Sequence, residues 1–258
     1  MTELKSSLWL RWANVAAFIL TILVNALAST ALLNGKSTGS ISDKYVTLIT
    51  PAGYVFSIWS VIYVLLFVFV AFQAMSSQKD KPFQRQIGVL FLLSCFFNIV
   101  WIFLWQYEYI TLSVPLMFGL LASLIAIYLR LDVGKANVLM REKLAVHLPF
   151  SVYLGWITIA SIADVAAALV SVSWDGFGIG YETWAILVIV VALIIALLVT
   201  LTRRDVGYGL VIIWALVGIA VKQSANQNIV TTTEISAIIV AVALILSILI
   251  FRFRRQKK

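Results

Sequence analysis

Long apolar segments, most of them close to twenty residues, dominate this chain and constrain its fold more than any other feature. In hydrocarbon every backbone N–H and C=O must be satisfied within the protein, so only helices and closed barrels cross a membrane. A barrel strand needs about 9–11 residues, whereas a helix needs about 20 to span about 30 Å. The hydrophobic fraction of 62% and the mean hydropathy of +1.04 support the same class. We therefore predict an all-α integral membrane protein.

The apolar segments predict eight transmembrane helices, of which the seventh is the shortest. They cover residues 8–33, 52–75, 87–106, 109–129, 144–172, 183–201, 207–221 and 234–251.

Lysine and arginine residues are unevenly distributed along the chain. With the N-terminus inside, every basic residue except Lys36, Lys44 and Lys222 falls in an inner segment. The positive-inside rule then favours an even number of spans with both termini cytoplasmic. The net charge of +8 follows from this topology, and it predicts contact with anionic lipid headgroups rather than with nucleic acid. We expect a multi-pass protein of a bacterial cytoplasmic membrane.

The first predicted helix resembles a secretory signal peptide in some respects, because Lys5 and Arg11 precede an apolar run with small residues near its end. The run continues to Leu33, which is longer than a usual signal core, so a retained anchor is favoured. Cleavage would leave seven spans and an outer N-terminus.

The chain offers few groups for metal binding or nucleophilic catalysis. Cys95 is the only cysteine and His147 the only histidine, so no transition-metal site and no required cofactor are expected. Catalytic motifs such as a phosphate-binding loop or a nucleophile elbow do not occur. We predict no catalytic residues.

The character of the helices changes near residue 175. The first five predicted helices carry Trp, Tyr, Asn and Pro, whereas the last three are almost uniformly aliphatic. Residues 171–182, which contain three glycines, form the predicted linker. We predict a functional five-helix domain over residues 1–174 and a structural three-helix extension with a basic tail over residues 175–258.

Asp164 is the one acidic residue deep inside an apolar run of the first five helices. A carboxylate at the centre of a bilayer costs roughly 2.5–3.5 kcal/mol on insertion scales, so an acid in such a position marks a functional site or a partner group. Asp164 is the first candidate site residue.

Three of the first five helices each carry aromatic and polar residues at the spacing i, i+3, i+7, which lies on one helical stripe. The stripes are Phe56, Trp59 and Tyr63; Asn98, Trp101 and Trp105; and Tyr153, Trp156 and Ala160, with Asp164 one turn further. Such rings with a few polar groups resemble the lining of an apolar ligand pocket. Aromatic residues near helix ends also form interfacial belts, and we assign Trp105, Tyr107, Tyr109 and Trp174 to a belt.

Depth in the membrane separates the remaining stripe residues from a belt. At 1.5 Å per residue, Trp59, Trp101 and Asp164 all lie roughly 10–15 Å below the outer surface. Asn98 and Asp164 are costly there unless they pair with each other, with a hydroxyl such as Tyr63, or with water. A purely structural polar pair between the third and fifth helices remains the alternative to a pocket.

The longest outer connection, residues 34–51, lies above this layer. It is rich in Gly and Ser, as expected of a mobile lid, and it ends at Pro51, a residue suited to the first turn of a helix.

The three stripes resemble motifs of one known family, the TspO/MBR or tryptophan-rich sensory proteins, which are related to the translocator protein, also called the peripheral benzodiazepine receptor. The segment from Pro51 to Tyr63 resembles the signature of the family's second helix, and Asn98-Ile-Val-Trp101 resembles that of its third. The segment from Tyr153 to Asp164 resembles that of its fifth helix. The last three predicted helices fall outside the resemblance.

The resemblance implies a five-helix bundle around a pocket for porphyrins, sterol-like molecules or synthetic aromatic ligands. Together, the stripes and the resemblance give the predicted ligand-binding residues Trp59, Tyr63, Asn98, Trp101, Tyr153, Trp156, Ala160 and Asp164. This chain departs from the family pattern in having Asp164 where the family usually has Asn. It also has mostly bulky residues over 87–97, where the family has a small-residue dimer seam, which leaves homo-oligomerisation open.

The function that we predict is a non-enzymatic membrane receptor or carrier for a planar hydrophobic ligand, a porphyrin-like tetrapyrrole or a sterol-like molecule. The alternative is a proton-coupled transporter in which Asp164 titrates. Porphyrin breakdown is an enzymatic variant by family analogy, and a structural scaffold is the remaining hypothesis.

Overall fold

The computed structural model describes the backbone of residues 8–256 and the side chains of residues 8–249. Over that range the chain is helical and contains no strand. The longer helices are α1 (Leu8–Ser29), α3 (Ile58–Ala74), α5 (Leu90–Gln106), α6 (Ile110–Arg130), α8 (Leu148–Ser171), α9 (Tyr181–Arg203), α10 (Val206–Lys222) and α11 (Gln227–Gln256). The short elements are α2 (Thr38–Lys44), α4 (Pro82–Ile87), α7 (Met140–Glu142), the 3-10 turns η1 (Gly53–Ser57), η2 (Ser76–Gln78) and η4 (Gly176–Gly178), and the π-helical turn η3 (Lys143–His147).

Each predicted span corresponds to one of the longer helices. Among the described residues, six helical stretches are long and apolar enough to cross a membrane, while α5 and α10 are apolar but only 17 residues long. At 1.5 Å per residue such a helix measures about 26 Å, slightly less than the hydrocarbon thickness of about 30 Å. The protein is therefore an all-α, multi-pass membrane protein. Eight crossings with both termini cytoplasmic remain a prediction.

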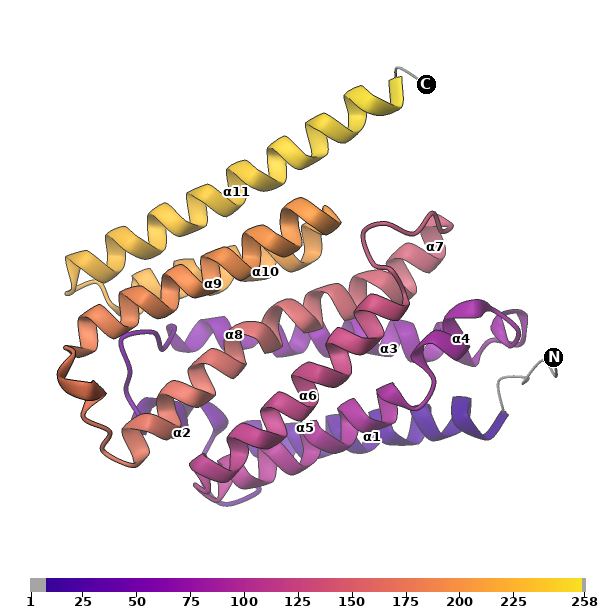
Figure 1. The fold of residues 1–258 in the computed structure, drawn as a ribbon. Helices are drawn as coiled ribbons and strands as arrows, with labels where there is room; N and C mark the ends of the chain where they lie inside the picture. Colours follow the sequence, from indigo (N-terminus) through magenta and orange to yellow (C-terminus); the bar gives the residue numbers. More distant parts are fainter. Residues whose placement is uncertain (1–7, 257–258) are drawn as a thin grey trace.

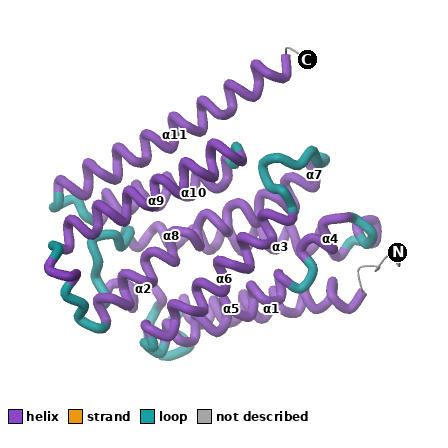
Figure 2. The backbone as a smooth tube through the Cα atoms, viewed as in Figure 1, coloured by secondary structure: helices purple, strands orange, loops and turns teal. Residues whose placement is uncertain are grey.

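Five helices close into a ring. Helix α1 packs against α3 and α5, α5 against α6, α6 against α8, and α8 against α3. Figures 1 and 2 show these helices running roughly side by side, with loops and short helices confined to the two ends. This ring corresponds to the five-helix bundle predicted for residues 1–174.

The last three helices attach to the ring mainly through α10, which packs against α8, α9, α11 and η1. Small residues allow this close approach. A Cβ on Gly155 of α8 would lie 3.1 Å from the carbonyl oxygen of Tyr208, and one on Gly207 would lie 2.5 Å from Oγ of Ser151. The contact between α8 and α10 is thus a packed seam.

Asp205 caps the start of α10 and is buried at the end of this seam that lies away from α2 (Figure 1). Its carboxylate accepts hydrogen bonds from the Tyr128 hydroxyl at 2.8 Å, the Ser151 hydroxyl at 2.5 Å and the backbone N–H of Tyr208 at 3.3 Å. Asp205 lies two residues before the start of the predicted span 207–221.

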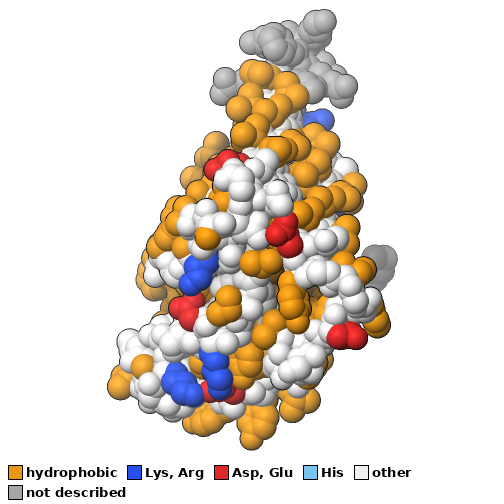
Figure 3. Space-filling view, turned by 90° about the vertical axis from the view of Figure 1, so that its left-hand side faces the viewer, with side chains coloured by type: hydrophobic (Ala, Val, Ile, Leu, Met, Phe, Trp, Pro, Cys, Tyr) orange, Lys and Arg blue, Asp and Glu red, His pale blue; other side chains and the backbone are white. Residues whose placement is uncertain are grey.

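Helix α2 lies at the end of the bundle opposite the first turn of α1 and the last turn of α11 (Figure 1). Figure 3 looks onto the α2 end, where a few lysine and acidic side chains adjoin each other among apolar ones. The candidate site lies beneath this end.

Candidate functional site

A cavity of about 50 Å³ lies between the ring helices and the segment that contains α2. Helices α3, α5 and α8 supply its walls, and α2 and the residues that follow it supply its cover. It is lined by Thr38, Ser42, Tyr45, Thr50, Pro51, Phe56, Trp59, Trp101, Trp105, Trp156, Ile159, Ala160, Ala163, Asp164 and Ala167. The lining is mostly apolar and aromatic, with a few hydroxyls and one carboxyl group, as in small-molecule sites generally.

Indole rings from three helices meet around the cavity. The ring of Trp59 stacks against that of Trp101 with centroids 6.4 Å apart, and meets that of Trp156 edge-on at 6.1 Å. Trp101 in turn stacks on Trp105 at 5.9 Å. Offset stacks and edge-on contacts are the arrangements that aromatic rings prefer. The indole rings that line the cavity therefore also pack against one another.

Asp164 is the only charged side chain among the residues that line the cavity, and it is 2% exposed. Its Oδ1 accepts the indole N–H of Trp101 at 3.3 Å and the hydroxyl of Ser113 at 3.0 Å; the same hydroxyl lies 3.2 Å from Oδ2. Both partners are neutral. Within the described chain, no basic residue lines this cavity.

Trp156 has an indole N–H without a hydrogen-bond partner, although the side chain is only 2% exposed. A buried donor left without an acceptor costs about 1–3 kcal/mol. The side chain of Trp156 also lines the cavity.

Of the eight predicted ligand-binding residues, five line the cavity. These are Trp59, Trp101, Trp156, Ala160 and Asp164. Their role in binding a ligand stays a prediction.

The other three predicted residues lie behind the cavity wall. The ring of Tyr63 stacks on that of the wall residue Trp59, with centroids 5.6 Å apart. Asn98 is fully buried; its Oδ1 accepts from Asn25 of α1 at 2.7 Å, and its Nδ2 donates to the hydroxyl of Tyr153 at 3.1 Å. These contacts join α1, α5 and α8 and support the wall without lining the cavity.

The structure excludes one of the alternatives for Asn98 and Asp164 and corrects one belt assignment. Asn98 and Asp164 do not pair with each other, because each has its own partners on other helices. Trp105 is not a belt residue: it is 6% exposed, lines the cavity and donates its indole N–H to the carbonyl of Thr38 at 3.3 Å. Tyr107 and Tyr109, in contrast, are exposed, as a belt requires.

Segment 34–51 covers the cavity as a lid and contains a helix, α2, where the sequence suggests a mobile loop. Ser37 caps α2, its hydroxyl accepting the backbone N–H of Ser40 at 3.2 Å. Five residues of the lid line the cavity, namely Thr38, Ser42, Tyr45, Thr50 and Pro51.

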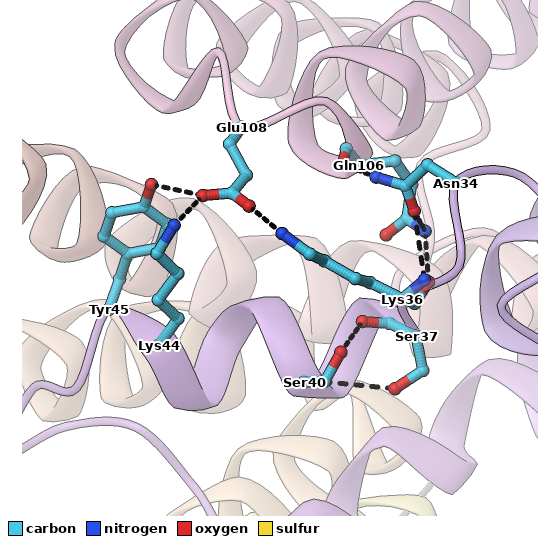
Figure 4. A network of polar contacts seen from close by, with 8 residues as sticks. All are labelled: Asn34, Lys36, Ser37, Ser40, Lys44, Tyr45, Gln106 and Glu108. Atoms are coloured by element: carbon cyan, nitrogen blue, oxygen red, sulfur yellow. Dashed lines mark hydrogen bonds and ion pairs between the residues drawn. The ribbon is translucent and has the colours of Figure 1, made fainter.

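Glu108, in the turn between α5 and α6, fastens the lid on one side (Figure 4). Its carboxylate accepts from Lys36 at 2.5 Å, from Lys44, and from the hydroxyl of Tyr45 at 3.0 Å. Hydrogen bonds from Lys36 and Lys44 lower the pKa of Glu108 from its ordinary value of 4.5 to about 2. We call these four residues the Glu108 latch. Beside it, the side chain of Gln106 donates to the carbonyl of Lys36 at 2.8 Å.

Helix α10 fastens the other side of the lid. The side chain of Gln223 donates to the carbonyl of Thr47 at 3.2 Å, and Lys222 pairs with Asp43 at 2.9 Å. The indole N–H of Trp214 donates to the carbonyl of Val55 in η1 at 3.2 Å. The three lysines expected outside, Lys36, Lys44 and Lys222, thus all pair with carboxylates around the lid.

Several residues of the site were not identified from the sequence. Trp105 falls on the correct stripe, four residues after Trp101, but its position near a helix end suggested a belt. Ala163 and Ala167 follow Ala160 at the spacing i+3 and i+7, but an alanine gives no chemical indication of a binding site. Ser113, the hydroxyl partner of Asp164, belongs to a helix that contributes no stripe.

Comparison with known protein families gives one match. A family model described as TSPO-like protein matches residues 11–250. The matched region includes α9, α10 and most of α11, so it extends beyond the helices that carry the three motifs. Neither the curated proteins nor the solved structures include a match to this chain.

Proposed function

Because the chain belongs to the TSPO-like protein family, we propose that it is a membrane receptor or carrier for a planar hydrophobic ligand, a porphyrin-type tetrapyrrole or a sterol-like molecule. The observation that carries the proposal is the lidded cavity bounded by the rings of Trp59, Trp101 and Trp156. Flat apolar surfaces of this kind bind planar ligands by stacking. The role is sensing or transport of the ligand in a bacterial cytoplasmic membrane, with the basic inner face against anionic lipids.

Ligand binding requires the lid to open. One water molecule needs about 10–15 Å³ of such a cavity, so the volume of about 50 Å³ holds only a few water molecules. A tetrapyrrole is many times larger. Because α2 covers the cavity and the walls are helices packed in a closed ring, the lid is the element that has to move. The structure therefore corresponds to a closed state.

Titration of the detergent-purified protein with protoporphyrin tests the proposal. The absorbance of the bound porphyrin and the quenching of tryptophan fluorescence both report binding. We expect Trp59→Ala and Trp156→Ala to weaken binding about tenfold or more, since stacking on an indole contributes roughly 1–3 kcal/mol.

Trp12→Ala is the matched control, because Trp12 is exposed on α1 and 59% accessible. It removes one indole from the fluorescence signal without touching the cavity. If the wild type, the two cavity variants and Trp12→Ala all bind with equal affinity, the cavity is not the binding site.

A proton-coupled carrier is the second candidate. It is favoured by Asp164, a membrane acid whose side-chain partners are neutral. In proteoliposomes, Asp164→Asn would then abolish a pH-driven flux of ligand while equilibrium binding remains. Flux that is insensitive both to a pH gradient and to this substitution would exclude the carrier mechanism.

A further inference from the structure

We propose that the cavity selects a planar ligand that carries a positive charge, such as a flat heteroaromatic cation or an aromatic ring with a protonated amine. The inference rests on the proposed function, since it assigns the chemical class of the ligand to that same cavity. It follows from the unbalanced carboxyl group of Asp164, from the ring faces around it and from the distribution of charge near the lid.

The carboxyl group of Asp164 has fewer donors than a buried carboxylate needs. An ionised carboxylate has room for about four hydrogen bonds, and Asp164 is offered one indole N–H and one hydroxyl. The single proton of the Ser113 hydroxyl is also shared, because that oxygen lies 2.7 Å from the carbonyl of Ile110. A buried charge without an opposite charge is strongly destabilising. A ligand cation would supply the missing partner.

The indole rings provide a second attraction for a cation. Trp59, Trp101, Trp105 and Trp156 all line the cavity together with Asp164. The face of an indole ring attracts a cation within about 6 Å of its centroid more strongly than a phenyl ring does. A carboxyl group surrounded by several indoles is therefore suited to a delocalised or substituted ammonium, whose weak hydration makes it easier to transfer into the membrane.

The charges of the lid do not compensate Asp164. Lys36 and Lys44 belong to the lid, but neither lines the cavity. Both ammonium groups bind the carboxylate of Glu108 instead. The described residues lining the cavity include no Lys, Arg or His. The only charged group of the lining that an anion would meet is the carboxyl group of Asp164, whereas a cation meets no like charge.

A pair of compounds of the same shape tests the charge requirement. The 1-methylquinolinium cation and neutral 1-methylnaphthalene have the same bicyclic outline and differ in charge. Equilibrium dialysis with the same detergent on both sides corrects for partition into micelles. We expect the cation to bind the wild-type protein about tenfold more tightly than the naphthalene, which is the effect expected of a desolvated cation with aromatic and carboxylate partners.

Asp164→Asn keeps the shape of the side chain and removes its charge. We expect it to weaken quinolinium binding about tenfold and to leave naphthalene binding unchanged. Asp80→Asn is the matched control, since Asp80 is exposed at the inner end of the molecule and the substitution changes the net charge equally. The comparison of the two compounds on the wild type remains decisive if Asp164→Asn does not fold.

The two proposals fail in different ways. Equal binding of the two compounds, with protoporphyrin still bound through Trp59 and Trp156, would overturn the charge requirement and leave the proposed function standing. Absence of binding by protoporphyrin and by both compounds would overturn the proposed function, and the charge requirement with it.

Discussion

The backbone N–H of Ala52 donates a hydrogen bond to the carbonyl of Gly218 at 2.9 Å, and this bond joins the end of the lid to α10. Gly218 has to be a glycine for this contact, because a Cβ there would lie 2.1 Å from Cγ2 of Val55. Valine is stiff at χ1 and has little freedom to move aside. The last three helices therefore take part in positioning the lid, and are more than an addition beside the bundle.

We predict that Gly218→Ala destabilises the protein by about 1–3 kcal/mol, since overpacking forces the backbone or side chains to shift. Gly180→Ala serves as the control because a Cβ at Gly180 meets nothing within 4 Å. Thermal unfolding in detergent measures both. An unchanged midpoint for Gly218→Ala would show that η1 moves away from α10 without cost.

Glu108→Gln is expected to loosen the lid. The substitution removes both ion pairs of the Glu108 latch, so we predict faster hydrogen exchange at the backbone amides of α2 and faster ligand association. The change in global stability should stay within about 1 kcal/mol, because the lysine partners are largely exposed. Glu142→Gln is the control, because α7 lies at the end of the bundle away from α2 (Figure 1). If exchange at α2 stays slow in Glu108→Gln, the contacts with α10 hold the lid closed instead of the Glu108 latch.

The latch also predicts a dependence on pH. The pKa of Glu108 in the folded protein is lowered to about 2 from 4.5. A group with a lowered folded-state pKa stabilises the fold fully above its unfolded pKa and loses that contribution as the pH falls toward the folded value. Hydrogen exchange of α2, corrected for the intrinsic rate, should therefore be constant above about pH 5 and rise only below it. A transition near pH 7 would contradict the latch.

Trp156→Phe separates the ring of Trp156 from its N–H. Because the N–H has no partner, its removal should leave thermal stability unchanged or slightly increased. Trp105→Phe is the matched comparison: it removes the bond to the carbonyl of Thr38, and a loss of about 1 kcal/mol is expected. Similar losses of stability in both variants would mean that Trp156 has a partner in solution.

Asn98→Leu tests the position of Asn98 behind the wall. It leaves the Asn25 amide and the Tyr153 hydroxyl without their shared partner, so we predict a loss of stability of about 1 kcal/mol, typical of hydrogen bonds between membrane helices. Ligand affinity should stay within twofold of the wild type, because Asn98 does not line the cavity. A tenfold loss of affinity with unchanged stability would indicate that Asn98 contacts the ligand.

The spans and the aromatic wall were predictable because hydropathy and helical spacing are local properties of the sequence. Trp59, Trp101 and Trp156 face one cavity as their spacing suggests. Asn98 shares a stripe with Trp101, yet its side chain contacts helix α1 and does not line the cavity. Its partner Asn25 belongs to a helix without a recognisable pattern.

The attachment of the lid was not predictable, since it depends on residues far apart in the sequence. Nothing near Glu108 indicates that Lys36 and Lys44 converge on it. The bond between Lys222 and Asp43 likewise joins the end of α10 to α2, which approach each other only after the last three helices dock. The cap at Ser37 is a local signal that identifies α2 in retrospect.

The small closed cavity also affects how any measured affinity should be interpreted. A ligand that binds only the open lid has an apparent dissociation constant equal to the intrinsic one divided by the open fraction. If about one molecule in a hundred is open, binding weakens a hundredfold, or about 2.7 kcal/mol, before any contact with the rings is counted. Two homologous proteins with identical cavity walls would then differ in sensitivity to the same compound through their lid residues alone.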